Sequence, residues 1–314
     1  MSEGSAIHDL LPALGHEVLD RRADLRTTGW AAVPVDRVML VLDGAAATPV
    51  VLGPDGSMRL ALADSSGAAV GPGSGADILL GVDPAGRAWC GRVVDRDHVT
   101  VAPEARWAGL REVALELAAD QRGILAELVA LANWHQTHVR CPRCGSPTEI
   151  AGLGWWRHCP QDGTEHYPRT DPAVIALLLD DGDNALLGRQ TRWPIGAFST
   201  LAGFVEPGES AESAVLREIG EEVGLRPHTT TYLGSQPWPF PASLMLGYHA
   251  RIGGVRPHPR PDGIEIAEAR WISRAELPAL CESREVRLPG RLSIAHHLVR
   301  SWLGRTLPDE WCRW

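Results

Sequence analysis

Short apolar runs broken by Gly, Pro and Asp dominate residues 30–100 of the chain. Runs of this kind are typical of short strands joined by turns, so they predict a small β-rich domain. Residues 104–138 instead space their apolar positions as a helix does, and they contain no proline. They predict one long helix that ends this domain.

The pattern changes again at Asp171. Residues 171–190 read as two strands joined by a polar turn, and more strand-like segments follow. Helical patterns lie within residues 203–225 and 291–303. This order of elements fits an α/β fold in which a mixed sheet carries helices on both faces.

Composition and charge narrow the class of protein. The 314 residues carry a formal net charge of -9, which disfavours broad binding to nucleic acids or membrane surfaces. No run approaches the roughly 18 apolar residues of a membrane span, and residues 1–22 do not read as a secretory signal. We therefore expect a cytoplasmic protein with no membrane partner. The glycine-rich stretch 69–77 lacks the Gly-Lys-Ser/Thr of a phosphate loop and predicts a flexible turn.

Three of the six cysteines form a cluster. Cys141 and Cys144 make one knuckle, and Cys159 begins a second of the same shape, in which Asp162 stands where the second cysteine belongs. Two such knuckles describe a zinc ribbon, whose closed tetrahedral site needs four ligands. Asp162 is the leading fourth ligand, because carboxylate oxygen binds Zn²⁺. Other donors within reach are His135, His138, His158 and His166.

The alternative is a ribbon without metal, held together by packing around Trp155 and Trp156. In either case we expect this segment to have a structural role and not a catalytic one.

The second cluster lies in GFVEPGESAESAVLREIGEEVGL, residues 203–225. Glu218, Glu221 and Glu222 stand three and four positions apart and so share one face of a helix. Like charges this close repel one another unless hard cations lie between them. Mg²⁺ and Mn²⁺ take oxygen ligands and complete their shell with phosphate and water. We expect a catalytic Mg²⁺ or Mn²⁺ site on this face.

The residues before the helix fit the same site. Gly203 and Gly208 are expected to let the loop turn back tightly, which brings backbone carbonyls, that of Ala202 among them, toward the metals. Glu209 and Arg217 are expected to pair and to fix this loop on the helix.

This spacing resembles the Nudix box at every defining position, namely Gly203, Glu209, Arg217, Glu218, Ile219, Glu221, Glu222, Gly224 and Leu225. The resemblance implies an α/β/α sandwich around a mixed sheet. It also implies metal-dependent hydrolysis of a nucleoside diphosphate linked to another moiety. Glu218, Glu221 and Glu222 would then be metal ligands, and Glu222 would help to activate water.

A proline-stiffened stretch, SQPWPFPASLM at 235–245, follows ten residues after the box. Its prolines fix an extended backbone, and a rigid Trp238 beside a phosphate-cleaving centre suits stacking on nicotinamide or adenine. Standing alone, such a stretch would favour a stiff core loop. At this place its pattern resembles the NADH pyrophosphatase branch of the family, which also has a ribbon, an N-terminal domain and a homodimeric assembly.

Carried over by position, the resemblance implies a set of substrate contacts. Phe204 and Trp238 would sandwich the nicotinamide, one of them contributed across the dimer, and Glu265 would complete the metal site. Arg111 matches a basic substrate contact less clearly, and a solvated charge is the alternative. The remaining implied contacts are Tyr167, Gln236, Pro237, Pro239, Phe240, Pro241, Ala242, Ser243 and the backbone of Ala295.

Two positions depart from the branch. Asp162 replaces the expected cysteine of the ribbon, which puts its zinc in question. Gly154 stands where the branch can carry an acidic substrate contact. A side chain cannot make that contact here.

The expected function is that of an NADH pyrophosphatase, which hydrolyses NADH, and NAD⁺ more slowly, to AMP and NMNH or NMN. Removal of NAD caps from RNA is a related candidate activity. The alternatives are a Nudix hydrolase for ADP-ribose or another nucleoside diphosphate derivative, and a non-catalytic Nudix nucleotide sensor.

The expected domains are a β-rich N-terminal domain ending in a long helix (1–138), a zinc-ribbon-like segment (139–168) and a catalytic Nudix domain (169–314).

Overall fold

The structure is a computed structural model, and it describes residues 14, 19–34, 36–44, 47–61, 77–94, 97 and 101–312. The predicted flexible turn at 69–77 lies outside these residues except for Asp77. The chain divides into two compact units. Within the described residues, the C-terminal unit contains residue 14, 171–237 and 243–312, and the N-terminal unit contains 19–170 and 238–242.

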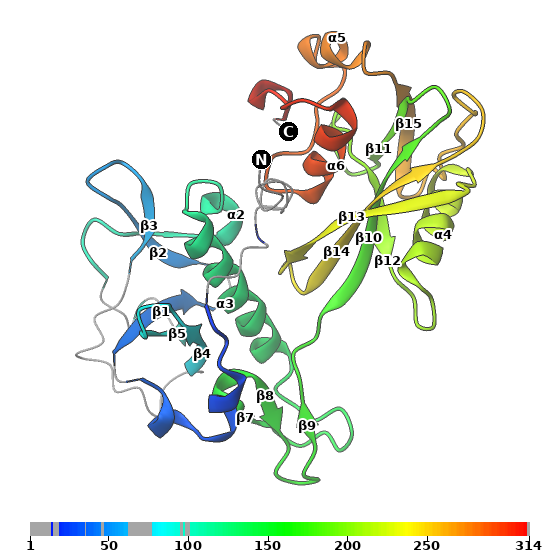
Figure 1. Ribbon diagram of the computed structural model, residues 1–314. Coiled ribbons are helices and arrows are strands. Elements are labelled where there is room, and N and C mark those ends of the chain that lie inside the picture. The colour runs from blue at the N-terminus through cyan, green and yellow to red at the C-terminus, as the bar shows by residue number, and fades with distance from the viewer. Residues whose placement is uncertain are drawn as a thin grey trace. The chain divides into compact units, whose positions relative to one another are not determined.

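A six-stranded mixed sheet forms the centre of the C-terminal unit (Figure 1). Its strands are β10 (Asp171–Leu179), β11 (Ala185–Gln190), β12 (Leu201–Phe204), β13 (Thr229–Trp238), β14 (Ser243–Arg251) and β15 (Ile266–Ile272). They run in the order β13, β14, β10, β11, β15, and β12 also pairs with β10. The central strand β10 is parallel to β14 and antiparallel to β11 and β12.

Helices cover both faces of this sheet because the residues of β10 alternate between two cores. The helices are α4 (Ala211–Val223), α5 (Leu277–Glu282) and α6 (Ile294–Leu303), and a short turn, η5 (Asp309–Cys312), follows. Val174 and Ala176 pack with the apolar side of α4, whereas Ile175 and Leu177 pack with α5 and α6. A strand buried on both faces reads as a continuous apolar run. The predicted α/β/α sandwich and its mixed sheet are confirmed.

Two three-stranded sheets and helix α3 make up most of the N-terminal unit (Figure 1). Its elements are η1 (Ala23–Thr27), η2 (Trp30–Ala32), β1 (Arg37–Asp43), β2 (Thr48–Leu52), β3 (Met58–Leu60), β4 (Asp77–Val82), β5 (Ala88–Val94), β6 (Arg106–Ala108), α2 (Leu110–Val113) and α3 (Ala119–Thr137). The sheet orders are β1, β5, β4 and β3, β2, β6. A Cβ on Gly91 of β5 would overlap Leu128 of α3, so the helix lies directly on that strand. The predicted β-rich region is confirmed.

The long helix starts later than predicted. Residues 106–108 form β6, which pairs with β2, and α2 is a separate short helix. Ala118 has φ -58° and ψ 152°, so helical geometry begins only at Ala119. Leu110 and Val113 are buried in the domain without belonging to α3. Apolar spacing alone does not separate these cases, and the prediction of one helix over 104–138 is wrong before Ala119.

The ribbon follows α3 as a small antiparallel sheet. Its elements are β7 (Glu149–Ala151), η4 (Gly152–Gly154), β8 (Trp156–His158) and β9 (Glu165–His166). Leu153 joins the buried cluster that includes Leu79 and Cys90 of the β-rich region, and the Trp155 indole N–H donates to the Leu79 carbonyl at 2.7 Å. Trp155 therefore anchors the ribbon to the rest of its unit.

Gly154 leaves no room for a side chain. Its φ is +93°, and a Cβ would lie 2.9 Å from Ile78 Cα. The same residue's carbonyl oxygen is 2.8 Å from His135 Nε2.

Across the described residues, no helix has the length and apolar character needed to cross a membrane.

Candidate active site and metal centres

Helix α4 presents the glutamates, and both of its ends are fixed by local chemistry. Ser210 caps the first turn, where its Oγ accepts from the Ser213 N–H at 3.2 Å. Gly224 ends the helix in the left-handed region at φ 68°. Ala214, Val215 and other apolar positions bury the opposite side of the helix against the sheet.

Arg217 holds the preceding loop and two of the acids together. Its guanidinium donates to both carboxylate oxygens of Glu209, at 3.0 and 2.9 Å, which confirms the predicted pair. It also donates to Glu218 at 2.8 Å, to Glu221 at 3.1 Å and to the Phe204 carbonyl at 2.8 Å. The hydrogen bonds from Arg217 hold the pKa of Glu209 below its usual value.

Glu222 is the most unusual acid of the site. Its side chain is 3% exposed, and neither carboxyl oxygen makes a hydrogen bond of good geometry, although the Ala202 backbone N–H lies close enough to lower its pKa slightly. Burial, and then the negative charges of Glu218 and Glu265, raise the pKa of Glu222 to about 8. A buried carboxylate without a donor is costly unless a proton or a cation compensates it.

Glu218 lies against the backbone of β12. A Cβ built on Gly203 would overlap the Glu218 carboxyl group, so only glycine leaves space for this acid. The structure corrects the role expected for Gly203, because its φ is not in the left-handed region and it does not form the turn. Gly208 does take that region, at φ +86°. Burial raises the pKa of Glu218, against the lowering effect of Arg217.

Glu265 reaches the same acids from a loop before β15. Its negative charge contributes to raising the pKa of both Glu218 and Glu222. The Asp262 carboxylate fixes that loop by accepting the backbone N–H of Ile264, Glu265 and Ile266. Sequence reasoning missed Asp262, although the Asp262-Gly263 pair is a recognisable turn signal.

The donors suit hard cations. Carboxylate oxygens of Glu218, Glu222 and Glu265 match the ligand type that Mg²⁺ and Mn²⁺ take, and the backbone of Ala202 lies beside Glu222. The orphaned oxygens of Glu222 are the observation that fits a cation. Among the described residues these acids do not form a group with all ligand atoms within 4.8 Å. Glu221 is exposed and turned toward Arg217.

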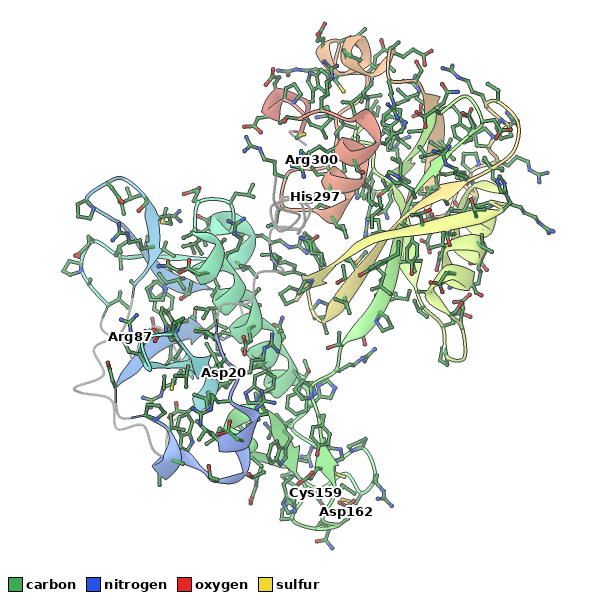
Figure 2. The ribbon with its side chains drawn as sticks, in the orientation of Figure 1. Asp20, Arg87, Cys159, Asp162, His297 and Arg300 are labelled. Carbon is green, nitrogen blue, oxygen red and sulfur yellow. The ribbon has the colours of Figure 1, made fainter. Side chains whose placement is uncertain are left out.

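The ribbon does form such a group. Ligand atoms of Cys141, Cys144, Cys159 and Asp162 all lie within 4.8 Å of one another, and Cys159 and Asp162 are seen together in Figure 2. Asp162 Oδ1 accepts from the Thr164 hydroxyl at 2.5 Å, and Oδ2 lies 3.4 Å from Cys141 Sγ. The Thr164 hydroxyl bond also lowers the pKa of Asp162.

The histidines proposed as other donors lie outside this group. Two of them are engaged elsewhere: His135 contacts Gly154 and Arg157, and His138 Nδ1 lies 3.1 Å from the Trp134 carbonyl. His166 Nε2 lies 3.1 Å from the Thr164 hydroxyl. Three thiols and one carboxylate fit the donor set of a structural Zn²⁺ site.

The tip of the proline-stiffened stretch, residues 238–242, belongs to the N-terminal unit. The Trp238 and Phe240 rings meet edge to face with centroids 5.1 Å apart. The Arg111 guanidinium lies 4.1 Å from the Phe240 centroid and 5.2 Å from that of Trp238. This contact argues against a purely solvated Arg111.

Asn133 of α3 holds the backbone of the same tip. Its amide Nδ2 donates to the Pro239 carbonyl at 2.9 Å and to the Pro241 carbonyl at 3.1 Å. Sequence reasoning missed Asn133, because a single Asn in an amphipathic helix carries no signal of a partner 106 residues away.

Gln236 acts inside the protein. Its side chain is 0% exposed, and its amide donates to the Leu292 carbonyl at 2.6 Å and accepts from the Ile294 N–H at 2.7 Å. Gln236 therefore ties β13 to the start of α6. Ala295 is also buried there, and its N–H donates to the Ser293 Oγ at 3.2 Å.

The other predicted contacts are placed as follows. Phe204 is 59% exposed at the end of β12 in the C-terminal unit, whereas Trp238 belongs to the N-terminal unit. Tyr167 is 63% exposed, and its hydroxyl donates to Glu165 at 2.5 Å. Pro237 and Pro241 are exposed, Ala242 and Ser243 are half-buried, and Pro239 is buried.

Comparison with known proteins places these features in one family. The model of the NUDIX domain matches residues 169–289, and that of the NADH pyrophosphatase zinc ribbon domain matches residues 136–167. A Stutzerimonas stutzeri protein described as NAD-capped RNA hydrolase NudC is 43% identical over 205 residues, 65% of this chain and 70% of that protein. A Mycobacterium tuberculosis protein with the same description is 46% identical over 187 residues, 57% of this chain and 59% of that protein.

Among solved structures, a NUDIX hydrolase from Nitrosomonas europaea is 20% identical, with a TM-score of 0.38 over 53% of this chain and 94% of that one. The family assignment rests on the sequence matches to both segments and on the length of the Stutzerimonas relative that the chain covers. The chain belongs to the Nudix hydrolase family, with the zinc ribbon domain of its NADH pyrophosphatase branch.

Proposed function

We propose that the protein hydrolyses the diphosphate bond of NADH and NAD⁺ to AMP and NMNH or NMN, and that it also removes NAD caps from RNA. The observation that carries the proposal is Glu222, a buried carboxyl with two unpaired oxygens beside Glu218. Relatives described as NAD-capped RNA hydrolases support the choice of substrate. The complete set of box glutamates argues against a non-catalytic sensor.

The residues divide the work of this reaction. Bound Mg²⁺ or Mn²⁺ would polarise the phosphates and lower the pKa of the attacking water. Glu218, Glu222 and Glu265 would hold the metal, together with Glu221 and the Ala202 carbonyl. Glu222, ionised once a cation lies beside it, would take a proton from the water at a carboxyl oxygen. Arg217 positions Glu218 and Glu221.

The direct test is chromatography of the products after incubation with NADH, NAD⁺, ADP-ribose and NAD-capped RNA in the presence of Mg²⁺ or Mn²⁺. AMP and NMNH from NADH, and a 5′-monophosphate RNA from the capped RNA, are the expected products. If ADP-ribose is cut while NADH stays intact, the substrate assignment fails and the Nudix chemistry stands. If no substrate is cut, a nucleotide-sensing module becomes the better account.

Trp238→Ala should separate NADH from ADP-ribose as substrates. Loss of the indole removes the proposed stacking surface for nicotinamide, which ADP-ribose lacks. We expect kcat/KM for NADH to fall by about tenfold or more, as for a stacking contact of 1–3 kcal/mol, and kcat/KM for ADP-ribose to fall less. Equal losses for both substrates would rule out the stacking role.

Asn133→Ala should loosen the tip that carries Trp238 and Phe240, because two backbone carbonyls lose their donor. We expect KM for NADH to rise by about three- to tenfold, in line with hydrogen bonds of roughly 1 kcal/mol, while kcat changes little. Steady-state kinetics separates the two constants. A change confined to the melting temperature would mean that Asn133 serves stability alone.

The ribbon should contain one zinc ion per chain, with Asp162 as the fourth ligand. Asp162→Ala should lower the affinity of the ribbon for Zn²⁺ by about 100-fold or more, since even outer-shell partners contribute 10–100-fold to metal affinity. Asp162→Cys should retain the metal. Metal analysis and thermal melting with a chelator give the readout. A purified protein without zinc, equally stable with and without chelator, would favour the packed, metal-free ribbon.

Several expectations stay predictions. They are the homodimer, the cytoplasmic location, the preference between Mg²⁺ and Mn²⁺, and the substrate contacts of Tyr167, Phe204, Arg111 and Ala295. Light scattering of the purified protein tests the dimer. Activity titrations with each metal test the preference.

A further inference from the structure

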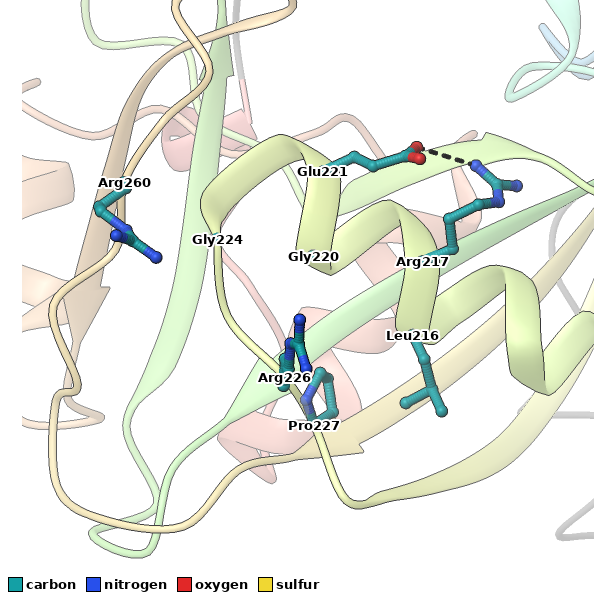
Figure 3. A pocket seen from close by; sticks show the side chains of 8 residues that line it. All are labelled: Leu216, Arg217, Gly220, Glu221, Gly224, Arg226, Pro227 and Arg260. Atoms are coloured by element: carbon teal, nitrogen blue, oxygen red, sulfur yellow. Dashed lines mark hydrogen bonds and ion pairs between the residues drawn. The ribbon is translucent and has the colours of Figure 1, made fainter.

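A hollow of about 520 Å³ lies along helix α4 within the C-terminal unit (Figure 3). Arg217 and Glu221 line it, and the same two residues belong to the glutamate site. Arg226 and Arg260 line it from the segments that follow the helix and precede Glu265. The hollow therefore begins at the edge of the proposed metal site.

Arg226 and Arg260 differ from most arginines of the protein. Within the part of the chain that the structure describes, neither guanidinium makes a hydrogen bond, an ion pair or a ring contact. Arg217 beside them is bonded to three carboxylates. Figure 3 shows the Arg226 and Arg260 side chains both turned toward the helix.

The backbone around these two arginines is held in place, although their guanidinium groups have no partner among the described residues. The Arg260 N–H donates to the Val223 carbonyl at 2.8 Å, and its side chain passes Gly224, where a Cβ would lie 3.2 Å from Arg260 Nε. Pro227 follows Arg226 and is buried. The hollow thus presents two guanidinium groups from anchored segments.

Free guanidinium groups are well suited to phosphate, since their planar donors match its oxygens. The net charge of -9 would repel a polyanion at long range. A polyanion therefore needs a local pair of cations to bind at this surface. The bond that is cleaved joins the two phosphates of NADH, so both are engaged at the reaction centre. An NAD-capped RNA carries one additional phosphodiester for each further nucleotide, and only this substrate has a phosphate left for a second site.

We infer that the hollow lined by Arg226 and Arg260 binds a backbone phosphate of the RNA chain in NAD-capped RNA. The inference rests on the proposed function and adds a subsite to it. Phosphate contacts carry no base information, so this subsite accepts RNA of any sequence beyond the cap.

The test compares kcat/KM for NADH and for a short NAD-capped RNA in the wild type and in Arg226→Gln/Arg260→Gln. The ratio of the RNA value to the NADH value should fall by about tenfold. A plot of log kcat/KM for RNA against log salt should become shallower by about 0.7, because one single-strand phosphate contact is lost and each such contact contributes roughly 0.7. Arg284→Gln is the matched control, since Arg284 also lacks a side-chain partner among the described residues.

The other outcomes are distinct. If the double variant lowers NADH and RNA turnover equally, the arginines bind a phosphate of the dinucleotide and the RNA assignment is overturned. If the wild type cuts NADH but no capped RNA, or if ratio and salt slope stay unchanged, the inference fails while the NADH activity stands. If neither substrate is cut, it is the proposed function that fails.

Discussion

Glu222→Gln should abolish most turnover without unfolding the protein. The amide removes both a metal ligand and the proposed proton acceptor, and a general base typically contributes 10²–10⁴-fold. We expect kcat for NADH to fall by about 10³-fold. Steady-state kinetics at saturating metal measures this, and Glu282→Gln, an exposed acid of α5, is the matched control.

The same substitution should stabilise the metal-free protein. In the folded chain the pKa of Glu222 is about 8, well above its ordinary value of 4.5. The folded state therefore holds an extra proton between these two values, and wild-type stability falls as pH rises from about 4.5 to 8. Glutamine has no such proton, so its advantage should grow over that window and reach a few kcal/mol, on the order of 1.4 per pKa unit.

Thermal or urea unfolding in EDTA at pH 5 and pH 8 checks this sign. A variant that is less stable than the wild type at pH 8 would mean that Glu222 has a donor in the folded protein. It would also remove the main support for a cation at this position.

The sequence predicted the local geometry of the box well, because spacing within one or two helical turns decides it. The presence of the helix and the Arg217–Glu209 pair both follow from such short-range spacing. The two layers of helices also follow from the apolar run of β10.

What the sequence could not supply depends on contacts between distant segments. The segment 106–113 has helical spacing, yet pairing with β2 and packing in the domain decide its conformation. Gln236 looks like a ligand of the substrate within its motif, and only the fold reveals that both ends of its amide are used at α6. Burial, which makes Glu222 unlike Glu221, is likewise a property of the packed helix.

Gly203→Ala is expected to have the second largest effect, and it acts through space alone. Gly203 pairs with Val174 of the central strand β10, so its backbone is held by the sheet. A methyl group there would overlap the Glu218 carboxyl, and the acid must leave its position. Misplacement of a catalytic group by about 1 Å can lower turnover by roughly 10²-fold, and overpacking costs about 1–3 kcal/mol of stability.

A double-mutant cycle shows whether Glu218 is the cause. Glu218→Asp shortens the acid by one methylene and relieves the overlap, so Gly203→Ala should be clearly less destabilising in that background than in the wild type. Gly253→Ala is the matched control, because a Cβ there meets only an Asp181 oxygen at 4.0 Å. Additive losses in the cycle would place the clash elsewhere than at the Glu218 carboxyl and would separate the need for glycine from the metal site. Coupled losses would establish that this glycine of the box is required by the acid that packs on it.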